Sequence, residues 1–401
     1  MTDLAAIEAR PKVAMRAGED KRLATGHPWA FSNEIEMDAA AKALPPGELV
    51  TLTRKDGRTL GVALFNPHSL IAARVLSRDP TAEINARFFE RRLQRALKLR
   101  ERLVDVPFYR LAHAEADGLP GAVIDRFGDV VVVEANSAGM DRLTEPLTAA
   151  IEKVLNPAII LLRGEGSARS SEGLEPMSRF AKGGLDGPIT IEENGAKFLA
   201  DLSAGQKTGW FYDQRNNRAL MAGFAKGGTC LDVYSYTGGF GVQAAVAGAT
   251  EVLAVDRSES ALNLLQKSAE LNGVGARVSV QRGEAFEALE SLIAEKKRFD
   301  IVCADPPAFV KSKKDFHVGS KAYRKLARLA AQAVTPGGLL FIASCSHNMP
   351  VDEFARQVAR GVHEGGRSAR QLYATGAAPD HPVHPFLPES AYLKALVLQV
   401  D

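Results

Sequence analysis

The chain of 401 residues is long enough for two or three domains, because one hydrophobic core rarely serves more than about 250–300 residues. Apolar residues make up 46% and charged residues 24%, as in folded soluble proteins, and the net charge of +2 means that any basic surface must be local. No apolar run approaches the roughly 20 residues that cross a bilayer, and the N-terminus lacks the order of a signal peptide. The sequence therefore predicts a cytoplasmic protein without a membrane partner.

Three cysteines stand at positions 230, 303 and 345, with no CxxC spacing between them. The eight histidines show neither an HExxH motif nor another paired-ligand spacing. A disulfide framework and a cysteine-rich zinc site are therefore not supported, and the sequence predicts a protein without a bound metal.

The first part of the chain has the pattern of a small β-rich domain. Short apolar runs alternate with turns, and Val50, Leu52 and Val62 follow the period of two that is typical of strands. The tripeptide KDG at 55–57 indicates a hairpin turn. We therefore predict a small β-barrel or sandwich over residues 1–82.

A mixed α+β domain is predicted over residues 83–190. Apolar residues at helical spacing, with an arginine-rich outer face, indicate a helix over 84–105. A hairpin in GAVIDRFGDVVVVEA, a second helix near 140–154 and the strand AIILLRG follow it. The glycine-rich stretch 181–188 is typical of a linker.

The remaining residues, 191–401, change to a regular alternation of strands and helices, and a hairpin turning at Asn194-Gly195 lies at the boundary. Alternation with helices of this length predicts a doubly wound, parallel α/β sheet, and two final strands predict an antiparallel edge. Helices are predicted at 214–226, 240–247, 259–272, 284–296, 320–334 and 351–363, and strands at 229–234, 251–255, 277–281, 299–304 and 338–344.

Ligands of open α/β sheets bind beyond the carboxyl ends of the strands, and here the strand ends carry suitable residues. The glycines of YTGGFG let the backbone turn tightly and approach a ligand. Asp256 follows the next strand, where its carboxylate could accept hydrogen bonds from two ribose hydroxyl groups. Glu284 and Phe286 follow the third strand, where an adenine could be bonded and covered.

Each of these features also has a purely structural interpretation. The glycines fit a tight turn without a ligand, and Gly239, Gly241 and Ala244 match the GxGxxG/A pattern of dinucleotide-binding enzymes. Asp256 could cap the following helix, although Ser258 can do so equally well. Their occurrence at successive strand ends favours a nucleoside-like cofactor.

Two further strand ends carry candidate catalytic residues. One buried strand ends in the rigid turn Asp305-Pro306-Pro307, which lacks two backbone donors, and the following strand ends in Cys345. Consecutive strands of a parallel sheet are often neighbours, so we expect Asp305 and Cys345 to face one crevice. A small core residue is the structural alternative for Cys345, and the polar residues around it argue against that alternative.

A thiol and a carboxylate beside such a cofactor suit methyl transfer to carbon 5 of cytosine. This carbon is a poor nucleophile until a thiolate adds at C6. A carboxylic acid within hydrogen-bond reach of N3 can absorb the charge that develops.

These motifs resemble the RlmI-type ribosomal RNA large-subunit (cytosine-5-)-methyltransferases, S-adenosylmethionine-dependent enzymes with an N-terminal PUA domain. The resemblance covers nearly the whole chain, and GQKTGWFYDQRNNR and SYTGGF are its specific motifs. It implies a PUA-like RNA-binding domain over 1–82, a Rossmann-like methyltransferase domain over 191–401, S-adenosylmethionine as the cofactor and large-subunit ribosomal RNA as the partner. The other matching motifs are RLATGHPWAFSNEI, EADGLPGAVIDRFGD, ADPPAF, SCSHNM and FLPESAYLKALVLQV.

The resemblance also implies roles for individual residues. Asp305 would interact with the cytosine base, and Cys345 would be the nucleophile. Related enzymes with two active-site cysteines carry one of them where this chain has DPPAF, so another base must remove the C5 proton, with His347 as one candidate. For Asp213, a helix cap competes with a cofactor contact. The residues implied around the cofactor are Lys207, Gln214, Arg215, Asp232, Tyr236, Gly238, Asp256, Glu284 and Phe286.

A basic segment directly follows the DPP turn. Between residues 311 and 328 there are seven Lys or Arg residues and one acidic residue, Asp315. Such a segment suits contacts to RNA phosphates, and a solvated helix face is the structural alternative. The expected RNA-binding residues are Lys311, Lys313, Lys314, Lys321 and Arg324.

For two other regions, the sequence leaves open whether they bind RNA. The arginine-rich helix at 87–102 is doubtful as an RNA surface, because Glu90 and Glu101 can form helical pairs with it. His27 and Trp29 resemble positions that shape the core and the RNA surface of PUA modules, and Trp29 is expected in the core.

The sequence therefore predicts transfer of a methyl group from S-adenosylmethionine to C5 of a cytidine in large-subunit ribosomal RNA, through a covalent Cys345–C6 adduct. An RNA methyltransferase that modifies another base atom without a cysteine, and a non-catalytic RNA-binding ribosome assembly factor, are the alternatives. A nicotinamide oxidoreductase is disfavoured, because no acid or base for hydride transfer can be placed. The modified nucleotide and the oligomeric state stay open, with a homodimer among the options.

Overall fold

The computed structural model of the protein describes residues 10–203, 205 and 208–401, and these residues form two compact units. The chain passes from one unit to the other after Asp186, within the glycine-rich stretch 181–188. The first unit contains the chain as far as Asp186, with Thr208 and Asp380–Pro388, and the second contains Gly187–Gly205, Gly209–Pro379 and Glu389–Asp401.

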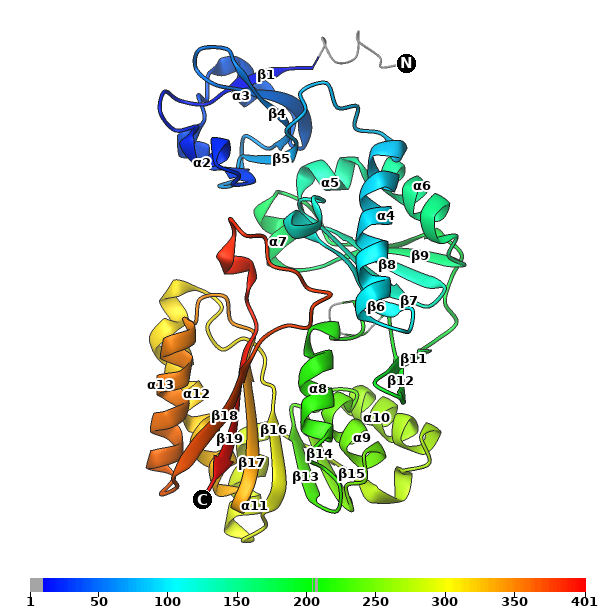
Figure 1. The fold of residues 1–401 in the computed structure, drawn as a ribbon, viewed down its shortest axis with the longest axis vertical. Helices are drawn as coiled ribbons and strands as arrows, with labels where there is room; N and C mark the ends of the chain where they lie inside the picture. Colours follow the sequence, from blue (N-terminus) through cyan, green and yellow to red (C-terminus); the bar gives the residue numbers. More distant parts are fainter. Residues whose placement is uncertain (1–9, 204, 206–207) are drawn as a thin grey trace. The chain divides into compact units, whose positions relative to one another are not determined.

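The first unit begins with a five-stranded sheet in the order β1-β3-β4-β5-β2 (Figure 1). β3 and β4 form the predicted antiparallel hairpin, and Gly57 in its turn has a φ of 87°, a left-handed conformation that favours glycine. The elements of this part are β1 (Lys12–Ala14), α2 (Lys21–Ala24), β2 (Trp29–Ala30), η1 (Ser32–Glu34), α3 (Ala39–Ala43), β3 (Glu48–Thr53), β4 (Thr59–Phe65) and β5 (Ala73–Ser77).

A second five-stranded sheet, in the order β10-β9-β8-β7-β6, follows in the same unit. The predicted helix over 84–105 is α4 (Ala86–Leu103), which begins after Asn85, whose side chain accepts a hydrogen bond from the N–H group of Phe88. Phe89 and Leu93 of this helix pack into the core of the α+β part. The other elements are β6 (Phe108–His113), η2 (Ala114–Asp117), β7 (Ala122–Phe127), β8 (Val130–Ala135), α5 (Ala138–Arg142), α6 (Thr144–Leu155), β9 (Ile159–Gly164), α7 (Ser167–Ser171) and β10 (Met177–Lys182).

Trp29 is half-buried and links the two sheets of this unit, instead of filling the core as expected. Its indole Nε1 donates a hydrogen bond of 2.8 Å to Glu115, which lies in η2. The guanidinium of Arg74 lies 5.4 Å from the centre of the indole ring and pairs with Glu172 at 2.9 Å. The expectation fails because the polar end of the indole finds a carboxylate in the neighbouring part of the chain.

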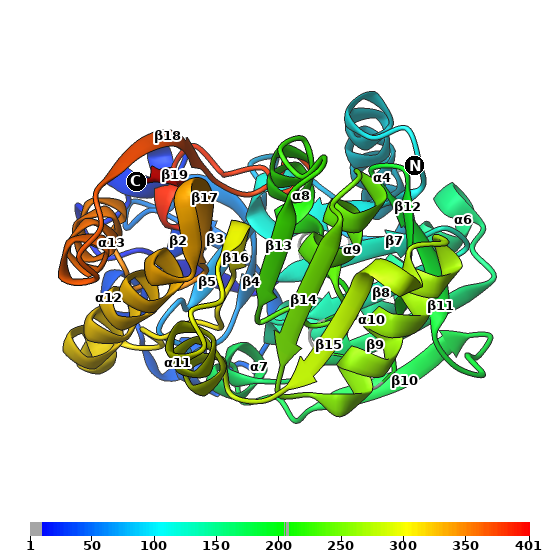
Figure 2. The ribbon, with the colours of Figure 1, turned by 90° about the horizontal axis from the view of Figure 1, so that it is seen from below.

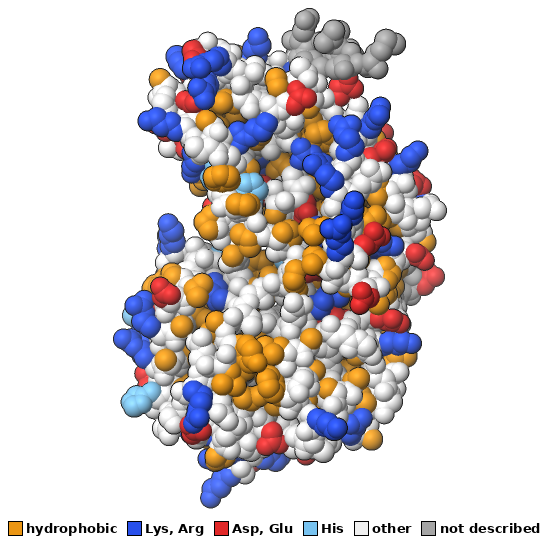
Figure 3. Space-filling model, in the orientation of Figure 1, with side chains coloured by type: hydrophobic (Ala, Val, Ile, Leu, Met, Phe, Trp, Pro, Cys, Tyr) orange, Lys and Arg blue, Asp and Glu red, His pale blue; other side chains and the backbone are white. Residues whose placement is uncertain are grey.

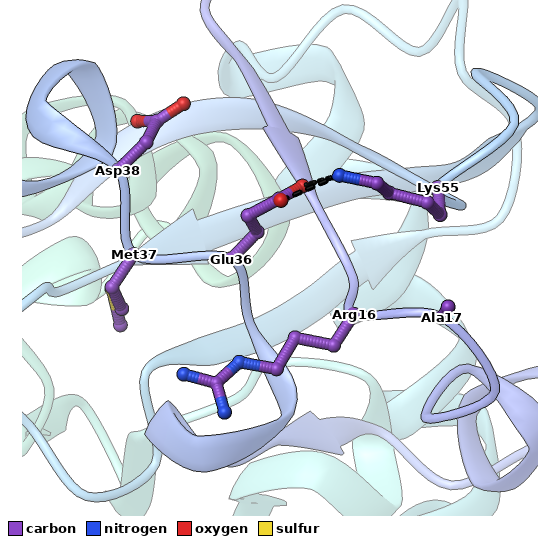
Figure 4. Close-up of a pocket in the computed structure, with 6 residues that line it drawn as sticks. All are labelled: Arg16, Ala17, Glu36, Met37, Asp38 and Lys55. Atoms are coloured by element: carbon purple, nitrogen blue, oxygen red, sulfur yellow. Dashed lines mark hydrogen bonds and ion pairs between the residues drawn. The ribbon is translucent and has the colours of Figure 1, made fainter.

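A pocket of about 380 Å³ opens beside the first sheet (Figure 4). The ammonium of Lys55 donates hydrogen bonds of 2.5 and 2.7 Å to the carboxylate of Glu36 in its wall. Two cations and two anions line the pocket, so it offers no net charge to a polyanion. The lining residues are Arg16, Ala17, Glu36, Met37, Asp38 and Lys55.

The second unit opens with the predicted hairpin, formed by β11 (Ile189–Glu193) and β12 (Ala196–Ala200). Asn194 and Gly195 have positive φ values of 51° and 78°, as the central residues of a type I′ turn do. The domain boundary expected at residue 190 falls inside β11, whereas both strands of the hairpin belong to the second unit.

A seven-stranded sheet in the order β15-β14-β13-β16-β17-β19-β18 forms the centre of the second unit. The first five strands are parallel and β19 is antiparallel to both its neighbours, which confirms the doubly wound sheet with an antiparallel edge. Figure 2 shows α8, α9 and α10 on one face of the sheet and α11, α12 and α13 on the other. The elements are η3 (Tyr212–Gln214), α8 (Arg215–Ala222), β13 (Thr229–Val233), α9 (Gly239–Val246), β14 (Glu251–Asp256), α10 (Glu259–Leu271), η4 (Gly275–Arg277), β15 (Val278–Arg282), α11 (Ala285–Ala294), β16 (Phe299–Ala304), η5 (Lys313–Asp315), α12 (Phe316–Gln332), β17 (Val334–Ser344), α13 (Val351–Glu364), β18 (Ala369–Thr375), η6 (Pro388–Ser390) and β19 (Lys394–Val400).

Two elements begin earlier than predicted. α12 begins at Phe316 and contains Gly319, whose Cβ, if present, would lie 2.5 Å from the carbonyl oxygen of Phe309. This glycine serves a close approach of two backbones, although a glycine in a sequence lowers the prediction of a helix. β17 begins at Val334 and passes through a Pro-Gly-Gly sequence that is typical of a turn, with an irregular register against β16.

Within the described ranges, no helix has the length and apolar character required to cross a membrane. The same residues contain no group of three or more His, Cys, Asp or Glu side chains arranged as metal ligands.

Candidate active site

The candidate site lies at the carboxyl ends of the parallel strands. The order of the strands reverses between β13 and β16, because β14 and β15 extend the sheet on one side and β17 extends it on the other. In open α/β sheets such a reversal opens a crevice for a ligand. β16 and β17 are neighbours, as predicted, so Asp305 and Cys345 follow adjacent strands at this edge.

The loop that joins β13 to α9 has an unusual backbone. Tyr234 and Tyr236 have positive φ values of 64° and 48°, and Gly238 has a φ of 89°. A Cβ atom on Gly238 would lie 2.5 Å from Cγ of Leu265, so no side chain fits there. A left-handed conformation of a non-glycine residue costs of order 1–3 kcal/mol, and such residues cluster at ligand-binding sites. The backbone therefore supports a binding role for this loop.

Asp232 is a fully buried carboxyl group at the end of β13, with 1% of its surface exposed. It accepts a hydrogen bond of 2.8 Å from the backbone N–H of Gly241. Burial is the main cause that raises the pKa of Asp232 to about 7; the bond from Gly241 lowers it, and the nearby carboxylates of Asp305 and Asp256 raise it further. We call Asp232, Asp256 and Asp305 the carboxylate cluster, and a cationic ligand would relieve the repulsion within it.

Asp256, at the end of β14, is bonded back to the β13–α9 loop. Its two carboxylate oxygens accept hydrogen bonds of 2.9 Å from the N–H groups of Tyr236 and Ser258. Ser258 is the N-cap of α10, and its hydroxyl accepts a bond from the N–H of Ala261, as the sequence allowed. Each oxygen of Asp256 keeps a second acceptor position, which is what a ribose diol requires.

Two hydroxyl groups of the same loop are buried and make no hydrogen bond to any described residue. They are Oγ of Ser235, in a residue that is 5% exposed, and Oγ1 of Thr237, in a residue that is 1% exposed. Leaving a buried polar group unsatisfied costs about 1–3 kcal/mol, and a polar ligand would remove this cost. These hydroxyls and the carboxylate cluster fit a ligand with polar and cationic groups, such as the ammonium and sulfonium of S-adenosylmethionine.

An aromatic surface lies beyond β15. The ring of Phe286 stacks on Phe309 with 6.2 Å between centres, and Phe309 contacts Tyr234 at 6.4 Å. Burial raises the pKa of Tyr234, and the nearby charge of Glu284 raises it further. The structure thus brings the predicted Glu284 and Phe286 together with Tyr234 and Phe309, which sequence reasoning missed because their contacts link three separate strand ends.

The segment before β13 reaches the β13–α9 loop through an aromatic contact. The ring of Phe211 meets that of Tyr236 at 5.5 Å, edge to face. Gln214 and Arg215 follow Phe211 and are buried at the start of α8. Lys207 lies outside the described residues. A cofactor contact of Gln214, Arg215 or Lys207 stays a prediction.

Asp213 does not cap the following helix. It lies inside η3, and its side chain accepts a hydrogen bond from the hydroxyl of Tyr392. The capping interpretation is wrong because the helical turn begins before Asp213, and the carboxylate is bonded to a residue far along the chain.

Cys345 and the DPP turn lie in contact. Sγ of Cys345 is 3.9 Å from the carbonyl oxygen of Pro306, and Cys345 and Asp305 are both partly exposed. The two prolines lack N–H groups, so the turn presents carbonyl groups and one carboxylate. Cys230 and Cys303 are buried, each 1% exposed, as expected for core residues. The structure therefore places the Cys345 thiol against the turn that begins at Asp305, and the catalytic roles of both residues stay predictions.

A buried network of hydroxyl groups holds the loop that carries Cys345. The hydroxyl of Tyr323 lies 2.8 Å from the hydroxyls of both Ser344 and Ser346. Oγ of Ser346 also accepts a hydrogen bond of 3.1 Å from the N–H of Val310. The residues on both sides of Cys345 are thus fixed to the end of the DPPAF segment.

Lys394 lies beside the loop that carries Cys345, and sequence reasoning did not single it out. It pairs with Ser344 across β17 and β19 and is 6% exposed. Its Nζ donates hydrogen bonds to the carbonyl oxygens of Ser346 at 2.6 Å and Met349 at 2.8 Å. Burial lowers the pKa of Lys394, whereas the nearby Cys345 raises it. The sequence does contain one sign of this residue, because a lysine is unusual within an otherwise apolar strand such as LKALVLQV.

The basic segment begins beside the Cys345 loop, where the side chain of Asn348 donates a hydrogen bond of 3.0 Å to the carbonyl of Lys311. Arg324 differs from the other predicted RNA-binding residues, because its guanidinium binds Gln357 at 2.7 Å and Glu364 at 3.2 Å. The predicted residues that are exposed and form no ion pair with another described residue are Lys311, Lys313, Lys314 and Lys321.

Two protein families match this chain. The family described as S-adenosylmethionine-dependent methyltransferase matches residues 180–399, more than half of the chain. The PUA-like domain family matches residues 13–78. The first match contains the carboxylate cluster, Cys345 and Lys394.

Curated relatives match over nearly their whole length. The protein called ribosomal RNA large subunit methyltransferase I in Pseudoalteromonas atlantica is 35% identical, over 97% of this chain and 99% of the relative. The protein of the same name in Shewanella denitrificans is 36% identical, with the same coverage.

Solved structures share the fold. A protein described as an S-adenosylmethionine-dependent methyltransferase from Streptococcus mutans has a TM-score of 0.81 at 23% identity, over 97% of this chain and 100% of that one. A methyltransferase complexed with SAH has a TM-score of 0.81 at 24% identity, over 97% of this chain and 99% of that one. The chain therefore belongs, with its full-length curated relatives, to the family of S-adenosylmethionine-dependent methyltransferases that carry a PUA-like domain, and S-adenosylmethionine is its cofactor.

Proposed function

We propose that this chain transfers a methyl group to C5 of a cytidine in large-subunit ribosomal RNA. The observation that carries the proposal is the contact between Cys345 and the DPP turn beside the carboxylate cluster. The names of the curated relatives support ribosomal RNA as the substrate class. The choice of C5 rests on the thiol, because methylation of an amine or of a guanine needs no cysteine.

Cys345 performs the first step of the proposed reaction. Its thiolate adds to C6 of the cytosine, which forms an S–C6 bond and makes C5 nucleophilic. Asp305, in its protonated form, donates a hydrogen bond to N3 and so stabilises the negative charge that develops on the ring. When bound, S-adenosylmethionine supplies the electrophilic methyl group. A base then removes the C5 proton, the C5=C6 double bond forms again, and the S–C6 bond breaks to return the thiolate.

The carboxylate cluster and its loop would hold the cofactor. Asp232, Tyr236 and Gly238 are proposed to surround its methionine part, where a buried carboxyl group suits an ammonium. Asp256 is proposed to accept the ribose hydroxyls. The aromatic surface with Phe286 would cover the adenine.

Lys394 is proposed to position Cys345 and to favour its thiolate. The ammonium holds two carbonyl groups of the loop that follows the cysteine, so it fixes the backbone that carries Sγ. A positive charge near a thiol favours the ionised form. Lys394 acts through Cys345 and has no direct role on the base.

The lysines of the basic segment would contact the RNA backbone beside the reacting base. Lys311, Lys313 and Lys314 are exposed, and the backbone of Lys311 is tied to the loop of Cys345 through Asn348. A target base must be unstacked to reach a thiol, which favours single-stranded or loop RNA.

Nucleoside analysis of methylated RNA tests this proposal. Ribosomal RNA incubated with the protein and cofactor, then digested, should contain 5-methylcytidine by mass spectrometry. Cys345→Ala should lower methyl transfer by on the order of 1,000-fold or more. Cys303→Ala is the matched control, because this buried cysteine lies in the core, and it should keep transfer within a few-fold. Full transfer by Cys345→Ala, or a methyl group on another base atom, would contradict the proposal.

A further inference from the structure

Helix α4 of the first unit carries a row of exposed cations that the proposed active site does not use. Their intervals of four, four, three and four residues follow the helical period, so all five share one face. The row covers about 22 Å along the helix at roughly 1.5 Å per residue. The members of this α4 row are Arg87, Arg91, Arg95, Lys98 and Arg102.

Acidic side chains do not neutralise the α4 row within the part of the chain that the structure describes. Glu90 and Glu101 could pair with it by spacing, yet neither forms an ion pair with a described residue. Arg100, on the buried side of the helix, pairs instead with Asp117 at 2.6 Å. The pKa of Arg92 falls to about 10, first because of burial and then because of the positive charges of its neighbours.

A solvated helix face selected only for stability would not have this pattern. Like charges three or four residues apart repel each other on a helix, and the five members of the α4 row form four such pairs in succession. Some exposed cations outside this helix have acidic partners: Lys325 pairs with Glu290 at 2.9 Å, and Lys55 pairs with Glu36. Figure 3 shows Lys and Arg side chains, with some Asp and Glu side chains among them, over the part of the first unit where Figure 1 draws α4.

We infer that the α4 row, which contains none of the proposed active-site residues, binds the phosphate backbone of the RNA substrate. The inference rests on the proposed function, which makes RNA the substrate. Four of the five members are arginines, whose planar guanidinium groups bind phosphate oxygens in a bidentate way. Such contacts carry no sequence information and supply affinity through the release of counterions.

The test removes three charges from the row with Arg87→Gln, Arg91→Gln and Arg95→Gln in one chain. These side chains are exposed, so the variant should fold as the parent does. Its dissociation constant for transcribed large-subunit ribosomal RNA, measured without cofactor, should rise about tenfold or more near physiological salt. The slope of log affinity against log salt should decrease by about 2, at roughly 0.7 for each lost phosphate contact on a single strand.

The matched control is Lys226→Gln, Lys267→Gln and Arg298→Gln, which removes the same charge from exposed positions of the second unit and should leave both quantities unchanged. Parental affinity and salt slope in the α4 variant overturn the inference. The inference is also overturned if naked RNA binding is unchanged while association with ribosomal particles weakens, a result that indicates an acidic protein partner. Because binding is measured without methyl transfer, the result is independent of the role of Cys345.

Discussion

At the scale of single residues, buried charges define the site more sharply than the glycines do. The glycine loop alone also fits a nicotinamide enzyme, but the buried carboxyl group of Asp232, with Asp256 and Asp305 close to it, suits a cationic ligand. Lys394 introduces a buried positive charge beside Cys345. Two of these features, the burial of Asp232 and the position of Lys394, come from long-range packing.

Cofactor affinity should depend on pH through Asp232. Its pKa in the free protein is about 7, and a cationic cofactor favours the ionised carboxylate, so binding must displace a proton below that pH. Calorimetry should show a dissociation constant that is flat above about pH 7 and rises by up to about tenfold per unit below it. Asp232→Asn keeps the acceptor for Gly241 but cannot ionise, and it should flatten the profile. An equal slope in both proteins would contradict the assignment.

The charge of Lys394 should control the reactivity of Cys345. Lys394→Met should slow alkylation of Cys345 by iodoacetamide by about tenfold near neutral pH, because the thiolate is the reactive form. The difference should shrink at alkaline pH, where the thiol ionises without help. Lys321→Met, which removes an exposed lysine of α12, should alkylate at the parental rate. An equal loss of rate at every pH would indicate a displaced loop and would exclude the electrostatic role.

At the scale of elements, the site depends on how α12 ties two loops together. The hydroxyl of Tyr323 contacts Ser344 and Ser346, and the backbone of the DPPAF segment is bonded to Ser346. The early start of α12 brings Gly319 against the carbonyl of Phe309, which fixes the same segment a second time. The thiol and the turn therefore form one rigid group.

Removal of the Tyr323 hydroxyl should loosen this group. Tyr323→Phe leaves the hydroxyls of Ser344 and Ser346 without their partner and should lower the free energy of unfolding by about 1–2 kcal/mol, measured by denaturant titration. Methyl transfer should fall by about tenfold, because small displacements of a reacting group are costly. Tyr373→Phe, an exposed ring on β18, should change neither quantity. Unchanged transfer in Tyr323→Phe would show that the network is structural only.

The sequence predicted the elements that have a local cause. The hairpin turns at Gly57 and at Asn194-Gly195 need positive φ values, which favour glycine and asparagine. The alternation of strands and helices predicted the parallel sheet with an antiparallel edge, although not the order of its strands. The bond from Tyr392 to Asp213 and the position of Lys394 depend on partners far along the chain, so no local pattern contains them.

At the scale of the whole molecule, the net charge of +2 does not reveal that the positive side chains are unevenly distributed along the chain. The α4 row in the first unit and the lysines at 311–314 in the second concentrate positive charge at two places, while acidic residues elsewhere balance the total. A count of charges therefore understates the affinity of this chain for a polyanion. Each unit has its own basic surface, so the two proposed contributions to RNA binding can be measured separately.

RNA that contains 5-fluorocytidine tests the proposed covalent step between Cys345 and the cytosine. Fluorine at C5 cannot leave as the proton does, so the S–C6 bond cannot break and the adduct persists after methyl transfer. With cofactor present, the covalent mechanism predicts a denaturant-resistant complex of protein and ribosomal RNA that is linked through Cys345, as mass spectrometry would show, and no complex for Cys345→Ala. The absence of a complex under conditions of turnover, or its survival in Cys345→Ala, would exclude Cys345 as the nucleophile.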